Sequence, residues 1–468
     1  MKGIAPLIST ILLIIITISG ATITYTFTSD FIGSNLFSPS MIMPLIIVES
    51  VELKNYGVAS INVRNLGTTT SIIDKVYMIS ILDGSIVGDY SPRYLEISPG
   101  QLTKINIEPS SLIASKDGNY YLKVVTKEGW IGFSKAFFLK GLDFGEWVEY
   151  SGNPVLDPYI RAYYPCVIYD VNGFHGHGVS AKYKMWFNSY YSNRYSIWFA
   201  FSNDGITWNL HNSPVSGLSD NSGHPWVLYF SEGFPGSNSG NNPNGTTMYY
   251  RIWYWDANKL YTVEAIRYAE SPDGINWYND QPVKNGLIPI ITGSSSDWNK
   301  GSYGPACVLY NPSASNSGTD WKFRMYYDGT PGHNESIGVG FSSDGITWIG
   351  YDKNGDGKAD PVLTGSSFGW DANYVYPCTV LKLGSKYYMF FSGGVSGTNE
   401  GIGYAISDDG LTWTKDPKNP IFHKNDGVSW RNARTYTPAV VKAEDGLRMY
   451  FTGVDSMGNY AIGYAMLK

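Results

Sequence analysis

The pattern of hydrophobic and polar residues divides the chain into three parts. In residues 1–36, a hydrophobic stretch carries no charged residue between Lys2 and Asp30. In residues 37–142, hydrophobic and polar residues alternate in short runs separated by turn sequences. Alternation with period two is typical of strands that have one buried face. This second part is therefore predicted to form an antiparallel β-sandwich of about seven strands that acts as a spacer.

The third part, residues 143–468, contains a repeated sequence. The motif Ser-x-Asp-Gly-(Ile/Leu)-x-Trp occurs four times, and three further strand-like segments precede it in each unit. The copies span Ser202–Trp208, Ser271–Trp277, Ser342–Trp348 and Ser407–Trp413. Repeated units of four strands are typical of propeller blades. The chain ends after three strands of a fifth unit, and residues 147–156 match residues 413–422. The segment 147–156 is therefore predicted to complete the fifth blade and close the ring.

Composition narrows the class of protein. The chain has 468 residues with 34 Lys and Arg against 40 Asp and Glu, so its net charge is −6. Only 16% of residues are charged and 15% are aromatic, which excludes a disordered chain and disfavours a nucleic-acid partner. The fold is expected to be mainly β because 52 Gly and 24 Pro suit a turn-rich protein. Three cysteines without a Cys-x-x-Cys spacing are expected to be buried core residues.

The first hydrophobic segment is long enough to cross a bilayer as a helix. A secretory signal peptide cleaved near residues 19–22 is an alternative. Residues 2–10 (Lys-Gly-Ile-Ala-Pro-Leu-Ile-Ser-Thr) resemble the class III signal of archaeal type IV pilins and pilin-like proteins. That resemblance implies cleavage between Gly3 and Ile4, a retained helix and pilin-like partner subunits, whereas the other interpretation is an ordinary membrane anchor. Either would place the rest of the chain outside the cell, at its surface.

One face of the predicted propeller is expected to bind carbohydrate. The aspartates of the four Ser-x-Asp-Gly motifs are interpreted as hairpin-turn residues on the other face. At the channel mouth the sequence places aromatic and polar residues before the first strands of the blades, some of them immediately before prolines. Aromatic faces stack on sugar rings, and polar groups bond to hydroxyls. The candidate binding residues are Tyr164, His224, Trp226, Trp370, Tyr376 and Arg434.

Residues 145–468 resemble the five-bladed propeller glycosidases of the arabinanase, levansucrase and invertase superfamily, on the Asp-Gly-x-x-Trp repeats and the Asn-Pro-Val-Leu sequence at 153–156. The resemblance implies two catalytic carboxylates. That superfamily often places an Asp directly before a strand-opening Pro. This chain has Tyr164, His224, Gly304, Tyr376 and Thr437 there. A catalytic site would have to use Asp157, Asp256, Asp328 or Asp371, or Glu264 as an acid.

Two functions therefore stay open from the sequence. The chain is either a glycoside hydrolase or a non-catalytic adhesin or structural surface protein. Two carboxylates facing each other across the channel mouth would favour the enzyme. The sequence Asn334-Glu335-Ser336 fits a glycosylation sequon, which is compatible with an extracellular location.

A loop in the third blade has the spacing of a calcium site. Oxygen ligands at alternate positions and a glycine at the sixth position are typical of a calcium loop. The predicted ligands are Asp352, Asn354, Asp356, Lys358 and Asp360, with Lys358 contributing its backbone carbonyl. Position twelve is Leu363 rather than the usual glutamate, so the predicted calcium would be structural.

Overall fold

The computed structural model describes residues 46–54, 56–108, 111–142, 144, 147–234, 245–330, 335–372, 374–395 and 398–468. The predicted hydrophobic segment 1–36 lies outside these ranges, and its role as an anchor stays a prediction. Within them the chain forms strands and two short 3-10 turns, η2 (Ala257–Lys259) and η3 (Ser429–Arg431). No helix in this described part is long and apolar enough to cross a membrane.

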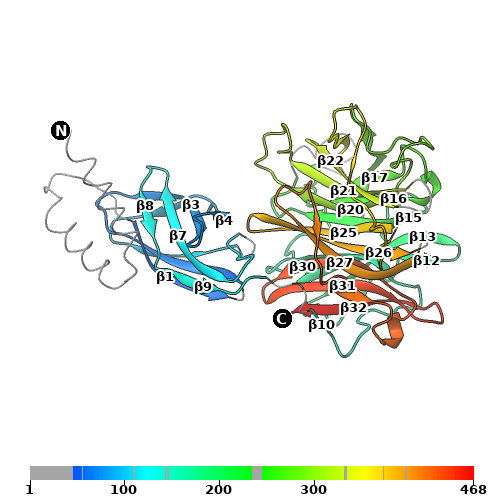
Figure 1. Ribbon diagram of the computed structural model, residues 1–468, viewed down its shortest axis with the longest axis horizontal. Coiled ribbons are helices and arrows are strands. Elements are labelled where there is room, and N and C mark those ends of the chain that lie inside the picture. The colour runs from blue at the N-terminus through cyan, green and yellow to red at the C-terminus, as the bar shows by residue number, and fades with distance from the viewer. Residues whose placement is uncertain are drawn as a thin grey trace.

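The first nine strands form a sandwich of two antiparallel sheets (Figure 1, blue to cyan). Their bounds are β1 (Ile46–Lys54), β2 (Gly57–Asn65), β3 (Ser71–Ser80), β4 (Ile86–Tyr90), β5 (Leu95–Ile97), β6 (Leu102–Asn106), β7 (Gly118–Thr126), β8 (Ile131–Phe133) and β9 (Phe137–Leu139). One sheet has the order β1-β2-β6. The other has the order β4-β3-β7-β8, with β5 and β9 paired to β3 and β7.

The sandwich core follows the period of two that the sequence shows. Ile61 and Val63 of β2 are fully buried, and so are Leu122 and Val124 of β7, whereas Lys123 between the latter is partly exposed. Alternate side chains therefore point into one core shared by the two sheets. Nine strands form rather than about seven because three-residue strands such as β5 are too short to show a pattern.

The rest of the described chain forms five sheets, antiparallel except for one short parallel pair in the third (Figure 1, green to red). The first two contain β11 (Tyr163–Tyr169), β12 (Tyr183–Tyr191), β13 (Arg194–Ser202), β14 (Asn209–Leu210), and β15 (Ser222–Tyr229), β16 (Tyr250–Asp256), β17 (Ile266–Ser271), β18 (Tyr278–Pro282). The third contains β20 (Pro305–Tyr310), β21 (Phe323–Gly329), β22 (Ser336–Ser342), β23 (Thr347–Gly350), with β19 (Lys284–Asn285) and β24 (Pro361–Leu363) added.

The fourth sheet contains β25 (Tyr374–Leu383), β26 (Lys386–Val395), β27 (Thr398–Ser407) and β28 (Thr414–Lys415), and β29 (Phe422–His423) also pairs with β27. The fifth contains β30 (Arg434–Ala443), β31 (Gly446–Val454), β32 (Tyr460–Leu467) and β10 (Trp147–Glu149). The strands that open the five sheets contact one another in the cyclic order β11, β15, β20, β25, β30 and back to β11. The described sheets therefore form a closed five-bladed propeller.

The ring closes where the sequence predicts. β10 pairs with β32 in antiparallel register, so that Trp147 lies opposite Leu467. Val155 also donates its backbone N–H to Ile462 O at 2.9 Å. A strand from the start of the propeller thus completes a blade built from its end, which leaves no open edge between the first and last blades.

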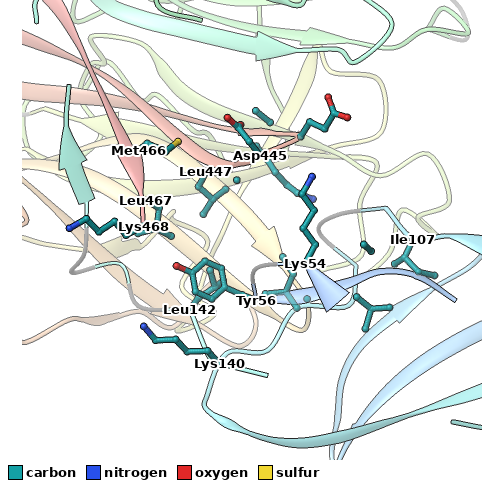
Figure 2. Close-up of a pocket in the computed structure, with 18 residues that line it drawn as sticks. Lys54, Tyr56, Ile107, Lys140, Leu142, Asp445, Leu447, Met466, Leu467 and Lys468 are labelled. Atoms are coloured by element: carbon teal, nitrogen blue, oxygen red, sulfur yellow. The ribbon is translucent and has the colours of Figure 1, made fainter. Parts of the chain in front are cut away.

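The sandwich and the propeller meet around the connecting segment. The ring of Phe144 packs against Tyr388, Phe390 and Tyr404 at centroid distances of 4.7, 5.3 and 5.2 Å. Beside this contact lies a cavity of about 610 Å³ between the two bodies (Figure 2). Its walls include Tyr56 and Ile107 of the sandwich, Leu142 of the connection, and Leu447 and Leu467 of the propeller.

The Ser-x-Asp-Gly motifs form turns, as their sequence predicts. Asp204 Oδ1 accepts backbone hydrogen bonds from Ile206 at 2.8 Å and Thr207 at 2.7 Å, and a hydroxyl bond from Ser202. The other three motifs repeat these bonds through their own aspartates, Asp273, Asp344 and Asp409. These four carboxylates are therefore occupied in capping turns.

Candidate functional site

The first strand of each blade has an irregularity at or next to its proline. The pairing of the first two strands shifts register across this residue in the first, second and fifth blades, and directly after the proline in the third and fourth. Tyr164, His224 and Thr437 adopt left-handed backbone angles, with φ of 52°, 48° and 52°. Such angles are costly for residues other than glycine and gather at functional sites. The irregularities place four of these pre-proline residues, Tyr164, His224, Tyr376 and Thr437, around a narrow cavity of about 20 Å³.

The structure brings together four of the predicted binding residues at this cavity. The rings of Tyr164 and His224 stack at 3.7 Å, and the hydroxyl of Tyr376 lies 3.2 Å from His224 Nδ1. Burial lowers the pKa of His224 to about 3, so its imidazole is neutral at physiological pH. Trp226 also lines the cavity and donates its indole N–H to Val308 O at 3.0 Å.

A wider pocket of about 520 Å³ shares Tyr164 and His224 with the narrow cavity. Its walls combine many aromatic side chains with two arginines and one carboxylate, contributed by different blades. The lining residues are Arg161, Tyr163, Tyr164, Tyr190, Tyr195, His224, Trp255, Tyr303, Glu335, Tyr374, Arg434, Tyr436 and Tyr460. Aromatic walls with a few polar groups are typical of sites for small organic ligands. We call this space the mouth pocket.

Glu335 supplies the carboxylate of the mouth pocket. It lies one residue before β22 and is 6% exposed. Burial raises its pKa well above the ordinary value, the neighbouring Asp328 raises it further, and a hydrogen bond with Tyr374 acts in the opposite direction. Its Oε2 atom is buried without a hydrogen-bond partner among the residues that the structure describes. A raised pKa favours the protonated carboxyl, which can donate a proton or a hydrogen bond.

Asp328, which was predicted as a catalytic candidate, lies at the end of β21 beneath the mouth pocket. It is fully buried and accepts hydrogen bonds from the backbone N–H groups of Tyr303 and Gly304 and from the hydroxyl of Ser302, at 2.9 to 3.0 Å. Burial raises its pKa to about 7, although these hydrogen bonds act in the opposite direction. Asp328 therefore shapes the charge state of Glu335 and does not itself line the pocket.

The other predicted carboxylates lie away from the mouth pocket. Asp157 is exposed on a loop. Asp256 accepts the backbone N–H of Asn258 at 3.0 Å as the cap of η2. Asp371 forms an ion pair with Lys415 at 2.5 Å and accepts a bond from a serine hydroxyl. None of the three lines the mouth pocket. Two carboxylates that face each other across the pocket, as an enzyme would need, are therefore not found among the described residues.

Of the two remaining predicted binding residues, Arg434 and Trp370, only one lines the mouth pocket. Arg434 lines the mouth pocket as expected. Trp370 instead packs flat against Phe391, and a Cβ atom added to Gly393 or Gly403 would come within 3.0 Å of its ring. Trp370 thus occupies a space that two glycines of adjacent strands leave free, and it does not line the pocket. The sequence could not separate this packing role from a sugar-stacking role.

The predicted calcium loop folds on itself through its own backbone. Asp352 accepts N–H bonds from Gly355 and Gly357, and Asp360 accepts one from Lys353. Asp356 accepts the N–H of Lys358. No group of three His, Cys, Asp or Glu side chains that could hold a metal ion is found among the residues described in the structure. Calcium binding stays a prediction, which a calcium titration of the melting temperature would test.

No protein-family model matches the sequence, and no curated protein matches it. Solved structures with a similar fold include a glycosyl hydrolase from Bacteroides ovatus, at 14% identity and a TM-score of 0.49 over 69% of this chain and 94% of that one. A protein of the GH130 family of mannoside phosphorylases matches at 15% identity and a TM-score of 0.48, over 70% and 95% of the two chains. The catalytic domain of a GH62 α-L-arabinofuranosidase from Coprinopsis cinerea matches at 12% and 0.44, over 69% and 96%. With sequence identities and TM-scores this low, the activities of those proteins cannot be assigned to this chain.

Proposed function

We propose that this protein binds carbohydrate in the mouth pocket of its propeller. The observation that carries the proposal is the wall of the pocket, in which aromatic rings from several blades surround a few polar groups. Sugar rings stack on such faces, while their hydroxyls need donors and acceptors. Trp255 and Glu335 both line the pocket, and each has a buried polar side-chain atom without a hydrogen-bond partner among the described residues. A sugar bound in the pocket would give both atoms a partner.

The test is isothermal titration of the protein with a panel of neutral and acidic oligosaccharides. Tyr195→Ala removes a half-buried ring from the pocket wall, which contacts the rings of Tyr190 and Trp255. The matched control is Tyr278→Ala, which removes an equally half-buried tyrosine from β18, away from the pocket. We expect at least one oligosaccharide to bind, with roughly tenfold weaker affinity for Tyr195→Ala and no change for Tyr278→Ala. Absence of binding by every oligosaccharide would contradict the proposal.

Hydrolysis of a glycosidic bond is a second candidate function, favoured by Glu335. A general acid needs a raised pKa and access to the leaving oxygen, and burial together with Asp328 raises the pKa of Glu335. Against this, no second carboxylate lines the pocket among the described residues. Binding without chemistry, as in an adhesin, therefore has the better support.

A reducing-sugar assay separates the two functions. If the protein is a hydrolase, Glu335→Gln should abolish sugar release and leave binding within about threefold, because glutamine keeps the shape and loses the acid. Binding by wild-type protein with no release from any bound oligosaccharide would leave the adhesin as the function.

We also propose that the sandwich holds the propeller away from a surface to which the N-terminal segment tethers it. The alternatives from the sequence, a pilin-like helix or an ordinary anchor, both require an extracellular propeller. Labelling of the chain with a membrane-impermeant reagent in intact cells would test the location, and N-terminal sequencing would show whether cleavage occurs after Gly3.

A further inference from the structure

The mouth pocket carries two arginines that have no acidic partner within the described residues. Several buried or half-buried arginines of the propeller pair with carboxylates, whereas Arg324 donates to the backbone carbonyls of Thr319 and Asp409. Arg251 pairs with Glu270 at 3.3 Å, and Arg267 pairs with Asp280 at 2.7 Å. Arg431 pairs with Glu149 at 3.0 Å. Arg161 is exposed and Arg434 is half-buried, and both line the pocket.

The two arginines belong to the same side of the pocket. Arg434 begins β30 and lies opposite Val454 of β31, and Val454 lies opposite Tyr460 of β32. The guanidinium of Arg161 lies over the ring of this same Tyr460, 5.5 Å from its centroid. Stacking on a ring leaves the N–H edges of a guanidinium available to a ligand in its plane. Both cationic groups are therefore placed where the last blade meets the first.

The backbone holds Arg161 in an unfavourable conformation. Its φ is 56°, in the left-handed region that residues other than glycine rarely adopt. Ile160 O accepts a hydrogen bond from the hydroxyl of Ser189, and Ala162 N–H donates to Tyr460 O, so both neighbours of Arg161 are fixed. Strain that the surroundings maintain is typical of binding sites.

Glu335 is the carboxyl of the described pocket wall. Burial together with Asp328 raises its pKa, which disfavours the negative charge that would balance the arginines. Burial lowers the pKa of His224, which is neutral. The wall thus carries two guanidinium groups and one carboxyl group whose charged form is disfavoured by burial.

We infer that the mouth pocket takes an acidic sugar, a hexuronic acid residue whose carboxylate binds Arg161 and Arg434. This inference rests on the proposed carbohydrate-binding function and names the class of sugar. The planar fork of a guanidinium matches a carboxylate through two parallel hydrogen bonds. The aromatic rings of the wall would hold the ring of the same sugar.

The experiment is titration of the full chain with trigalacturonate and with the same trisaccharide after reduction of its carboxyl groups to hydroxymethyl groups. A sulfated galactose trisaccharide is the third ligand. The variants are Arg434→Gln and Arg161→Gln, and the matched control is Arg194→Gln, which changes an exposed arginine of β13 outside the pocket. Thermal unfolding of each variant confirms that it folds.

We expect trigalacturonate to bind roughly 10- to 100-fold more tightly than its reduced form, since hydrogen bonds to charged groups are among the stronger ones. Arg434→Gln and Arg161→Gln should each remove most of this difference, with a much smaller loss of affinity for the reduced form, and Arg194→Gln should change neither affinity. Equal binding of acidic and reduced forms, or preference for the sulfated one, would overturn the inference while the proposed function stands. Failure of all three ligands, together with the whole neutral panel, would overturn both.

Discussion

The side-chain amide of Asn153 pairs with the backbone of Tyr464, which lies 311 residues later in the chain. Its Nδ2 donates to Tyr464 O at 2.9 Å, and its Oδ1 accepts from Tyr464 N at 2.8 Å. Asn419 makes the same two bonds to Tyr404 within the fourth blade. The asparagine extends the strand pairing by one residue, and in the fifth blade it joins the two ends of the propeller.

Replacement of this asparagine should weaken the closure. We expect Asn153→Ala to lower the free energy of unfolding by about 1–3 kcal/mol, because two hydrogen bonds are lost and the backbone N–H of Tyr464 loses its side-chain acceptor. Asn419→Ala is the matched comparison, since it removes the same bonds within one blade. Denaturant unfolding measures both. If Asn153→Ala is as stable as wild type, the segment from residue 147 does not hold the ring closed.

The turn aspartates should make the propeller sensitive to acid. Burial raises the pKa of Asp204, but hydrogen bonds from Thr207, Ile206 and Ser202 outweigh this and lower it to about 2. A lowered pKa adds stability above the unfolded-state value of about 3.9, and this stability is lost as the pH falls from about 4 to 2. Asp204→Asn should cost at most about 1 kcal/mol at pH 7, because the group is largely exposed.

That cost should disappear at pH 2, which a pH series of denaturant unfolding would show. The control is Asp157→Asn, which changes an exposed aspartate outside the turns. If Asp204→Asn changed the free energy of unfolding equally at pH 7 and pH 2, the negative charge of Asp204 would not be what stabilises the turn.

Asp328 should have the opposite pH dependence. Burial raises its pKa to about 7, so the folded state binds a proton that the unfolded state has already released. The protein should therefore lose stability as the pH rises from about 4 to about 7. Asp328→Asn removes this titration, so the stability of the variant relative to wild type should be higher at pH 8 than at pH 4. A difference that does not change with pH would show that Asp328 is charged throughout.

The contact between sandwich and propeller should depend on Phe144. Its side chain is 1% exposed and packs in a core of propeller residues. Phe144→Ala should destabilise the protein by about 3–5 kcal/mol and increase protease cleavage at the connection. Phe138→Ala, which changes a ring that is 57% exposed, is the control and should do neither. Unchanged cleavage in Phe144→Ala would mean that other contacts hold the two bodies together.

The sequence predicts the blades well because their signals are local. The repeated Ser-x-Asp-Gly turns and the period of two fix strand identity over a few residues, and the match of residues 147–156 to residues 413–422 predicts closure. The residues before strand-opening prolines also gather as expected, since four of them, such as Tyr164 and His224, line one cavity.

The side chains of the site were harder to predict because no repeat marks them. Glu335 lies in a glycosylation-like sequence, and its place in the pocket depends on the hairpin of β21 and β22, where Asp328 lies opposite Ile337. Counting along that hairpin could have found it. From the sequence alone, Trp370 looks the same as a tryptophan that stacks on a sugar. Its packing within the blade is indicated by two glycines on neighbouring strands, Gly393 and Gly403, which leave room for its ring.

The most direct test of the account is a crystal structure of the protein with the oligosaccharide that binds most tightly. We predict density for a sugar ring in the mouth pocket, in contact with Tyr195 and Trp255 and within hydrogen-bond distance of Glu335. A sugar bound elsewhere, for example in the cavity between the sandwich and the propeller, with the mouth pocket empty, would contradict the account.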